Sequence, residues 1–204
     1  MFAQIIRGRT SDPMAVRACL DRWMSDLAPT APGWLDTTSG VTDQGDFFAL
    51  VRFDSEEAAM ATISKPEHDR WWTELEEALD GGGPNIQQTS DLFFESRGDL
   101  ASARFIQVRM VQFNDLQRPM ELFHSSLPAR AAVRPDVLGT LNAACPNGYG
   151  VTLMYFRSEE AAREGEHREL SADVKEFLAE LRSLAVGPGE RLDLKTPWHD
   201  TPNQ

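Results

Sequence analysis

The sequence predicts an α+β protein in which one unit, with the order β-α-β-β-α-β, occurs twice. The first observation is a repeated stretch, because the residues from Phe47 to Ala59 return as Gly150 to Ala162. The two copies align at a constant offset of 103 residues, which places Ser55 opposite Ser158 and Gln4 opposite Gln107. A register held over most of the chain is typical of an internal duplication. The second observation is the same alternation of strand and helix patterns within each copy.

The first copy begins with a run of β-formers, Phe2 to Arg9, which predicts a strand. Asp12-Pro13 then supplies an N-cap residue and a proline at the first helical position. Apolar side chains from Val16 to Leu27 recur at i, i+3/i+4 and i+7, the spacing of a helix with one buried face. Gly33 to Val41 and Phe47 to Phe53 are expected to form a hairpin.

A second helix is expected to begin at Asp54-Ser55, to break at Pro66 and to stop at the glycines from Gly81 to Gly83. Ile86 to Phe94 then predicts a fourth strand. This order is the split βαβ arrangement of the ferredoxin-like fold.

The second copy predicts the same order, with its first helix shortened or kinked by Pro119 and Pro128. The expected elements are strand Phe105 to Phe113, a helix from about Asp115 or Pro119, strands Val137 to Ala143 and Tyr149 to Phe156, a long helix from Ser158 to about Leu184, and strand Glu190 to Thr196. We therefore expect one repeat at residues 1–97, a linker at 98–103, a second repeat at 104–197 and a tail at 198–204 that docks or is disordered.

The strands Phe47 to Phe53 and Val151 to Phe156 are apolar on both alternating faces. Helices cover one face of such a sheet, so the other face needs a second cover. We expect the two antiparallel sheets to pack face to face as an intramolecular α/β barrel. The chain would then be a monomer with an internal pseudo-dimer, and further homodimerisation is the alternative.

Composition excludes several classes of function. The net charge of −12 argues against nucleic-acid and anionic-membrane partners, which require clustered Lys and Arg. No apolar run is long enough to span a bilayer and no signal-peptide pattern is present, so we expect a cytoplasmic protein. The two cysteines, Cys19 and Cys145, occupy non-equivalent positions, and the four histidines lack the spacing of metal ligands. We expect no metal and no cofactor.

The repeat order, the Phe-x-Ser-Glu-Glu-Ala-Ala turn that begins at Phe53, and the segment Lys65-Pro66-Glu67-His68-Asp69-Arg70-Trp71-Trp72 together resemble the dimeric α/β-barrel superfamily, and within it the antibiotic-biosynthesis-monooxygenase group. The resemblance covers nearly the whole chain as a tandem fusion. It implies cofactor-independent oxygenation of aromatic compounds as one activity and haem degradation as another. Haem-degrading members resemble one another in an asparagine on the first strand, and neither first strand here contains one.

Four residues of the first copy are candidate site residues. His68 is the candidate general base, because an imidazole titrates near neutral pH. Trp34 and Trp72 are candidate contacts for a flat ligand, and Gln4 is a candidate polar contact on the first strand. Each has a simpler interpretation: a surface histidine, core-filling indoles and a structural amide. In the second copy, His124 has no assigned role, and the charged neighbours of His167 favour a solvated helix face.

The first hypothesis is therefore a cofactor-independent monooxygenase that acts on an apolar aromatic small molecule, with the first copy active. The second is a non-catalytic small-molecule binder or stress-response barrel, and the third a haem-binding protein. The substrate is not specified by any motif in the sequence.

Overall fold

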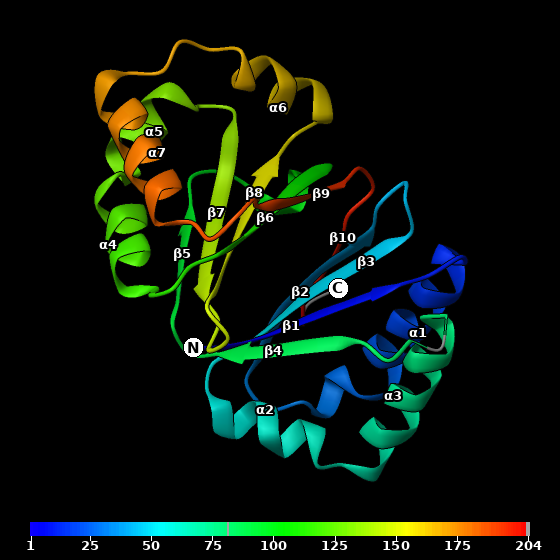
Figure 1. Ribbon diagram of the computed structural model, residues 1–204. Helices are drawn as coiled ribbons and strands as arrows, with labels where there is room; N and C mark the ends of the chain where they lie inside the picture. Colours follow the sequence, from blue (N-terminus) through cyan, green and yellow to red (C-terminus); the bar gives the residue numbers. More distant parts are fainter. Residues whose placement is uncertain (81, 203–204) are drawn as a thin grey trace. The chain divides into compact units, whose positions relative to one another are not determined.

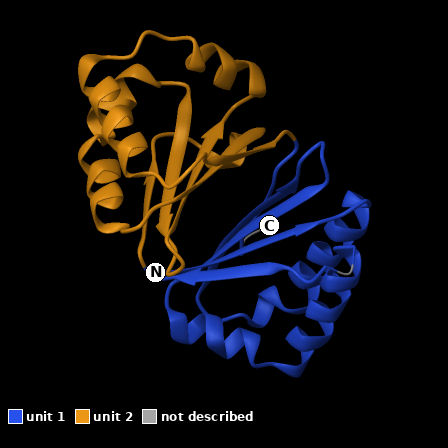
Figure 2. Cartoon of the chain, viewed as in Figure 1, with its two compact units in different colours: residues 1–90, 196–204 blue, residues 91–195 orange. Residues whose placement is uncertain are grey.

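The computed structural model describes residues 1–80 and 82–202, and it contains two sheets, each with helices on one face (Figure 1). The chain forms two compact units (Figure 2). Unit 1 consists of residues 1–90 and 196–204, and unit 2 of residues 91–195. The predicted fold class, two tandem ferredoxin-like β-α-β-β-α-β repeats, is confirmed.

Unit 1 contains a five-stranded antiparallel sheet in the order β10-β2-β3-β1-β4. Its elements are β1 (Phe2–Arg9), α1 (Pro13–Asp26), the 3-10 helix η1 (Ala28–Thr30), β2 (Trp34–Val41), β3 (Asp46–Phe53), α2 (Glu56–Ile63), α3 (Pro66–Ala78), β4 (Asn85–Thr89) and β10 (Trp198–Asp200). The predicted caps are present: Asp12 Oδ1 accepts the N–H groups of Met14 and Ala15 at 3.0 and 3.1 Å, and Ser55 Oγ accepts that of Ala58. Pro66 begins α3, which confirms the predicted break in the second helix.

Unit 2 has the corresponding order β5-β7-β8-β6-β9. Its elements are β5 (Leu92–Ser96), the 3-10 helix η2 (Leu100–Ser102), β6 (Phe105–Gln112), α4 (Gln117–Ser125), α5 (Leu127–Val133), β7 (Val137–Ala144), β8 (Tyr149–Phe156), α6 (Glu159–Glu166), α7 (Ala172–Leu184) and β9 (Glu190–Leu194). The expected disruption of its first helix is confirmed, because α4 and α5 meet at Ser126 and Pro128 lies in the first turn of α5.

Two predictions about element boundaries are wrong. The run Ile86 to Phe94 is not one strand: β4 ends at Thr89 and pairs with β1, whereas β5 begins at Leu92 and pairs with β7. The run from Ser158 to Leu184 is not one helix, because α6 ends at Glu166 and a second helix, α7, begins after Ser171, whose Oγ accepts the N–H of Val174.

One edge strand of each sheet comes from the end of the other repeat. β5 comes directly after the last strand of the unit 1 repeat, β4, but belongs to the sheet of unit 2. β10 comes directly after β9 of unit 2 but pairs with β2 in the sheet of unit 1. Part of the predicted tail is thus a strand.

The core of each unit lies between its sheet and its own helices. In unit 1 one cluster joins Val16, Leu20, Phe47 and Leu75, and a second is built around Trp23 and its neighbours. In unit 2 a cluster joins Phe105, Val137, Phe156 and Ala162. The face-to-face packing of the two sheets stays a prediction. Within the described ranges, no helix is long and apolar enough to cross a membrane.

Candidate functional site

Unit 1 contains a cavity of about 250 Å³ between the helix-facing side of its sheet and its helices. Its lining is mainly apolar. The sheet contributes Ile6, Phe47, Ala49 and Val51, and the helices contribute Leu20, Trp23, Trp71, Trp72 and Leu75. Polar lining groups are few: Gln4, Thr37, Thr62, His68, Asp69, Gln88 and Asp200. A mainly apolar concavity with a few polar groups is the usual form of a small-molecule site.

The strand register explains why these sheet residues share one face. Gln4 is opposite Val51 and Ile6 is opposite Ala49, and residues directly opposite in an antiparallel pair point to the same side. On the other neighbouring strand, Gln88 is opposite Gln4. Two side-chain amides therefore lie next to each other on the cavity side of the sheet.

His68 lies in the first turn of α3, is half-buried and lines the cavity. Its imidazole ring is nearly parallel to the indole of Trp72, with 6.1 Å between centroids and 11° between planes, and its centroid is 5.5 Å from that of Trp71. Burial lowers the pKa of His68, and the neighbouring Asp69 carboxylate opposes this effect only in part. The imidazole is therefore neutral at neutral pH and can accept a proton.

The two indoles beside His68 are held by different partners. Trp71 Nε1 donates to the Cys19 carbonyl at 2.7 Å, which connects α3 to α1. Trp72 Nε1 donates to Glu76 Oε1 at 2.7 Å, one turn further along the same helix. Both indoles are half-buried and line the cavity, and the expected ligand contact of Trp72 stays a prediction.

The other two predicted residues differ in position. Gln4 lines the cavity, and its amide is not hydrogen bonded to any residue in the described part of the chain. Trp34 is 5% exposed, donates to Thr37 Oγ1 at 3.1 Å and packs edge-on against Trp23. Trp34 is not among the cavity's lining residues, so its expected ligand contact stays a prediction without support from this geometry.

Sequence reasoning missed five polar lining residues, Thr37, Thr62, Asp69, Gln88 and Asp200. Gln88 could have been found from the antiparallel pairing that places it beside Gln4. Asp200 could not, because it reaches the cavity only through the pairing of β10 with β2. Its carboxylate is 6% exposed and accepts two hydrogen bonds from Arg17, at 3.0 and 3.1 Å.

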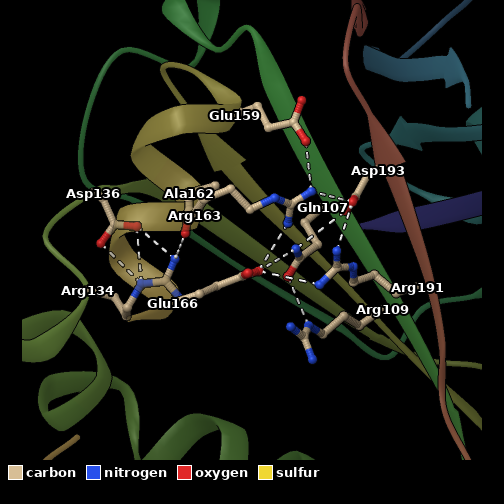
Figure 3. A network of polar contacts seen from close by, with 10 residues as sticks. All are labelled: Gln107, Arg109, Arg134, Asp136, Glu159, Ala162, Arg163, Glu166, Arg191 and Asp193. Carbon is tan, nitrogen blue, oxygen red and sulfur yellow. Dashed lines mark hydrogen bonds and ion pairs between the residues drawn. The ribbon is translucent and has the colours of Figure 1, made fainter. Parts of the chain in front are cut away.

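The corresponding region of unit 2 is charged. At the offset of 103 residues, Arg109 replaces Ile6, Glu166 replaces Ile63, and Lys175 replaces Trp72. Gln107 belongs to a network of ten residues, most of them charged (Figure 3). Gln107 donates to Glu166 Oε1 at 3.0 Å and accepts from Arg109 Nε at 3.0 Å.

Hydrogen bonds and opposite charges favour the ionised form of two acidic groups in this network, Glu166 and Asp193. Burial alone would raise the pKa of Glu166, but the hydrogen bond from Gln107 and the charges of Arg163 and Arg191 lower it. The same balance lowers the pKa of Asp193. The two units therefore present different chemistry on equivalent sheet faces.

Two remaining groups of candidates can be placed. His167 is exposed at the end of α6, and the centroid of the His124 ring in α4 lies 5.3 Å from that of Phe93. Cys19 and Cys145 are buried free thiols, and burial raises the pKa of Cys145 to about 11. In residues 1–80 and 82–202, no group of three or more His, Cys, Asp or Glu side chains is placed to hold a metal ion.

No family model matches the sequence, and no curated protein matches it. Solved structures do. An anthrone oxidase-like protein has a TM-score of 0.73 at 10% identity, and the match covers 100% of this chain and 94% of that one. A candidate monooxygenase from Lactobacillus acidophilus has a TM-score of 0.69 at 13% identity, covering 98% of this chain and 96% of that one. Another from Fusobacterium nucleatum has a TM-score of 0.76 at 6% identity, covering 98% and 94%.

These similarities extend over the whole tandem arrangement. At such low identities they show the fold, which is the one shared by monooxygenase-like proteins of the ferredoxin fold. The resemblance predicted from the sequence is confirmed at that level.

Proposed function

We propose that unit 1 binds a small, flat, apolar aromatic molecule and promotes its oxidation by molecular oxygen, with His68 as the general base. The observation that carries this proposal is a half-buried imidazole of lowered pKa that lines a mainly apolar cavity beside Trp71 and Trp72. A volume of about 250 Å³ lies just below the roughly 300 Å³ at which typical ligand pockets begin, which favours a compact ligand.

The chemistry follows from the neutral imidazole. His68 would remove a proton from a phenol, a hydroquinone or the CH₂ group of an anthrone, and the resulting electron-rich anion would reduce oxygen. For an anthrone, one CH₂ group and one O₂ molecule give one carbonyl group and one water molecule, so the reaction needs no other reductant. The structural similarity to an anthrone oxidase-like protein supports including this substrate class.

The two neighbouring amides provide a way to orient such a ligand. Gln4 and Gln88 lie opposite each other on β1 and β4, and each offers N–H donors and a carbonyl acceptor toward the cavity. We expect them to bind the ligand's phenolic or carbonyl oxygen, while the indoles of Trp71 and Trp72 contact its rings.

A second candidate function is binding without catalysis. The observation that favours it is that the His68 imidazole is not hydrogen bonded to any carboxylate in the described residues, whereas a catalytic base is usually oriented by a third group. In this case the cavity would hold the same class of ligand and His68 would only contribute to its wall.

Oxygen uptake with a panel of anthrones and hydroquinones, combined with tryptophan quenching, separates the two functions. Loss of a general base costs about 10²- to 10⁴-fold in rate. We expect His68→Ala to lose oxygen uptake to this extent while ligand quenching remains. His167→Ala is the matched control, because it removes an exposed histidine outside the cavity.

Each result has a defined meaning. Saturable quenching without oxygen uptake by the unmodified protein supports the binder. Unchanged uptake in His68→Ala removes His68 from the mechanism. The absence of both uptake and quenching contradicts both proposals for unit 1.

A further inference from the structure

The sheet of unit 2 presents a row of polar side chains to its helices. Asn142 on β7 is opposite Thr152 on β8, and Thr152 is opposite Arg109 on β6. The three side chains therefore point to one side of the sheet. Because neighbouring strands lie about 4.8 Å apart, Asn142 and Arg109 are separated by about 10 Å at the backbone.

This row lies on the helix-facing side. Met154 is two residues from Thr152 on the same strand and packs against the cluster of Phe105, Phe156 and Ala162, the last of which belongs to α6. Side chains two residues apart on a strand share a face. In unit 1 the equivalents of Arg109 and Asn142 are Ile6 and Ser39, so the row is specific to unit 2.

In the described part of the chain, Arg109 is the one arginine of the network in Figure 3 that forms no ion pair with a carboxylate. Arg163 pairs with Glu159, Glu166 and Asp193 at 2.9, 3.3 and 2.6 Å, and Arg191 pairs with Glu166 and Asp193 at 3.5 and 3.0 Å. Among the described residues, the Arg109 guanidinium is bonded only through Nε, to Gln107 Oε1. Figure 3 shows Arg109 at the edge of the network, joined to it through this one bond.

Asn142 provides a second, independent indication of a ligand. Its residue is 1% exposed, and one end of its amide is bonded to the Thr152 hydroxyl at 2.9 Å. The other end has no partner in the described chain, and nearby Thr140, 2% exposed, also has an unpartnered hydroxyl. Buried polar groups are rarely left without hydrogen bonds, so two of them on one sheet face indicate a polar occupant.

We propose that unit 2 has an anion-binding site on this face, in which the Arg109 guanidinium and the side-chain NH₂ group of Asn142 together bind the carboxylate of a small organic acid. The guanidinium fork matches a carboxylate in shape and charge. A monoanion is favoured over a phosphate dianion because the chain has a net charge of −12. Arg109 is an exposed residue, and partial desolvation together with the neighbouring positive charge of Arg191 lowers its pKa. A bound anion would offset both effects.

The site is separate from the aromatic cavity of unit 1, and either one can exist without the other. The probe should therefore be a carboxylate without a ring, so that it does not enter the apolar cavity. Butyrate meets this requirement.

A ¹H–¹⁵N NMR titration of the full chain with sodium butyrate tests the proposal, with sodium chloride at matched ionic strength as the reference. We expect saturable shifts of the Arg109 Nε–H and Asn142 amide peaks and no comparable shift of the Trp71 and Trp72 indole peaks. Arg109→Gln should weaken binding about tenfold or more, because it removes a charged hydrogen-bond donor. Asn142→Ser, which introduces the unit 1 residue, should weaken it about three- to tenfold.

Arg118→Gln is the matched control, since it removes the same charge from an exposed ion pair in unit 2 and should bind butyrate as the unmodified chain does. If Arg109→Gln does not fold, the titration of the unmodified chain and of Asn142→Ser decides. Shifts that chloride reproduces, or equal affinity in Arg109→Gln, would overturn the site. Tighter binding of phosphate than of butyrate at the same peaks would overturn its assignment to a carboxylate.

Discussion

His68 couples the stability of unit 1 to pH through its burial between two indoles. Burial lowers its pKa in the folded protein below the value of about 6.5 expected in the unfolded chain. As pH falls, the unfolded chain therefore binds the proton first, and the free energy of unfolding decreases. The contribution of neutral His68 is complete above the unfolded pKa and is lost as pH falls from there through the folded pKa.

The first prediction concerns this loss. Between about pH 7.5 and 5.5, the unmodified protein should lose more unfolding free energy than His68→Gln, which does not titrate. Urea denaturation at several pH values measures the difference. Parallel pH profiles for the two proteins would contradict the burial of the imidazole.

The second prediction distinguishes the two indoles beside His68. Trp71→Phe removes the hydrogen bond to the Cys19 carbonyl that joins α3 to α1, and should reduce the free energy of unfolding by about 1–2 kcal/mol. Trp72→Phe removes a bond to Glu76 within one helix and should cost less than about 1 kcal/mol. Denaturant midpoints compare them, and equal losses would argue against Trp71 as the link between the helices.

At the residue scale, the sequence predicted part of the candidate site. His68, Trp72 and Gln4, which the sequence indicated as candidates, line the cavity, and their roles in binding or catalysis stay predictions. Asp200 could not be predicted, since its position depends on its pairing with Thr37, 163 positions earlier in the chain. Trp34 lies in a core cluster and outside the lining of this cavity, and an indole on an inner face fills the core as readily as it contacts a ligand, so its ligand contact stays a prediction.

At the scale of elements, the short strand β10 is fixed by more than its backbone pairing. It pairs with β2 over three residues, and Asp200 adds a two-point ion pair with Arg17 on α1. Both side chains are largely removed from solvent, 8% and 22% exposed, so this pair should contribute more than a surface pair.

The third prediction follows from that difference. Asp200→Asn should destabilise the protein by about 1–3 kcal/mol, because Arg17 loses its buried charged partner. The matched control Glu180→Gln breaks an exposed pair with Arg118 and should cost less than about 1 kcal/mol. Chemical denaturation measures both, and equal effects would show that Asp200 does not anchor β10.

The elements themselves were predictable wherever the signal is local. Caps at Asp12, Ser55 and Ser158, the break at Pro66 and the alternating strands all appear as expected. The division of Ile86 to Phe94 into two strands was missed because only Ser90 and Asp91 interrupt the run, and neither is a strong breaker. Each half pairs with a different sheet, which is a non-local property.

At the scale of the whole molecule, the duplication has kept the fold and changed the chemistry. Equivalent positions hold an apolar cavity in unit 1 and a charge network in unit 2, so substitutions at a few sheet and helix positions are sufficient to change the type of site. Both repeats end in the same way. The strand after the first repeat, β5, lies in the second sheet, and the strand after the second repeat, β10, lies in the first sheet.

The fourth prediction tests this plan with fragments. A chain of residues 1–90 lacks β10, so the edge of β2 is uncovered and Arg17 loses Asp200. Uncovered strand edges promote association. The face of β3 that points away from the helices is also apolar in sequence and should add to this tendency. We expect residues 1–90 alone to aggregate or self-associate.

Co-expression with residues 91–204, which carry β10, should give a soluble one-to-one complex, whereas residues 91–195 should give little. Size-exclusion chromatography with light scattering measures the assemblies, and hydrogen exchange at residues 37–39 reports whether β10 covers β2, because Trp198 to Asp200 pair with those residues. A folded, soluble monomer of residues 1–90, or equal recovery with 91–195, would contradict the requirement for the exchanged strand. Loss of the complex only when β10 is removed would show that this short strand completes the first sheet.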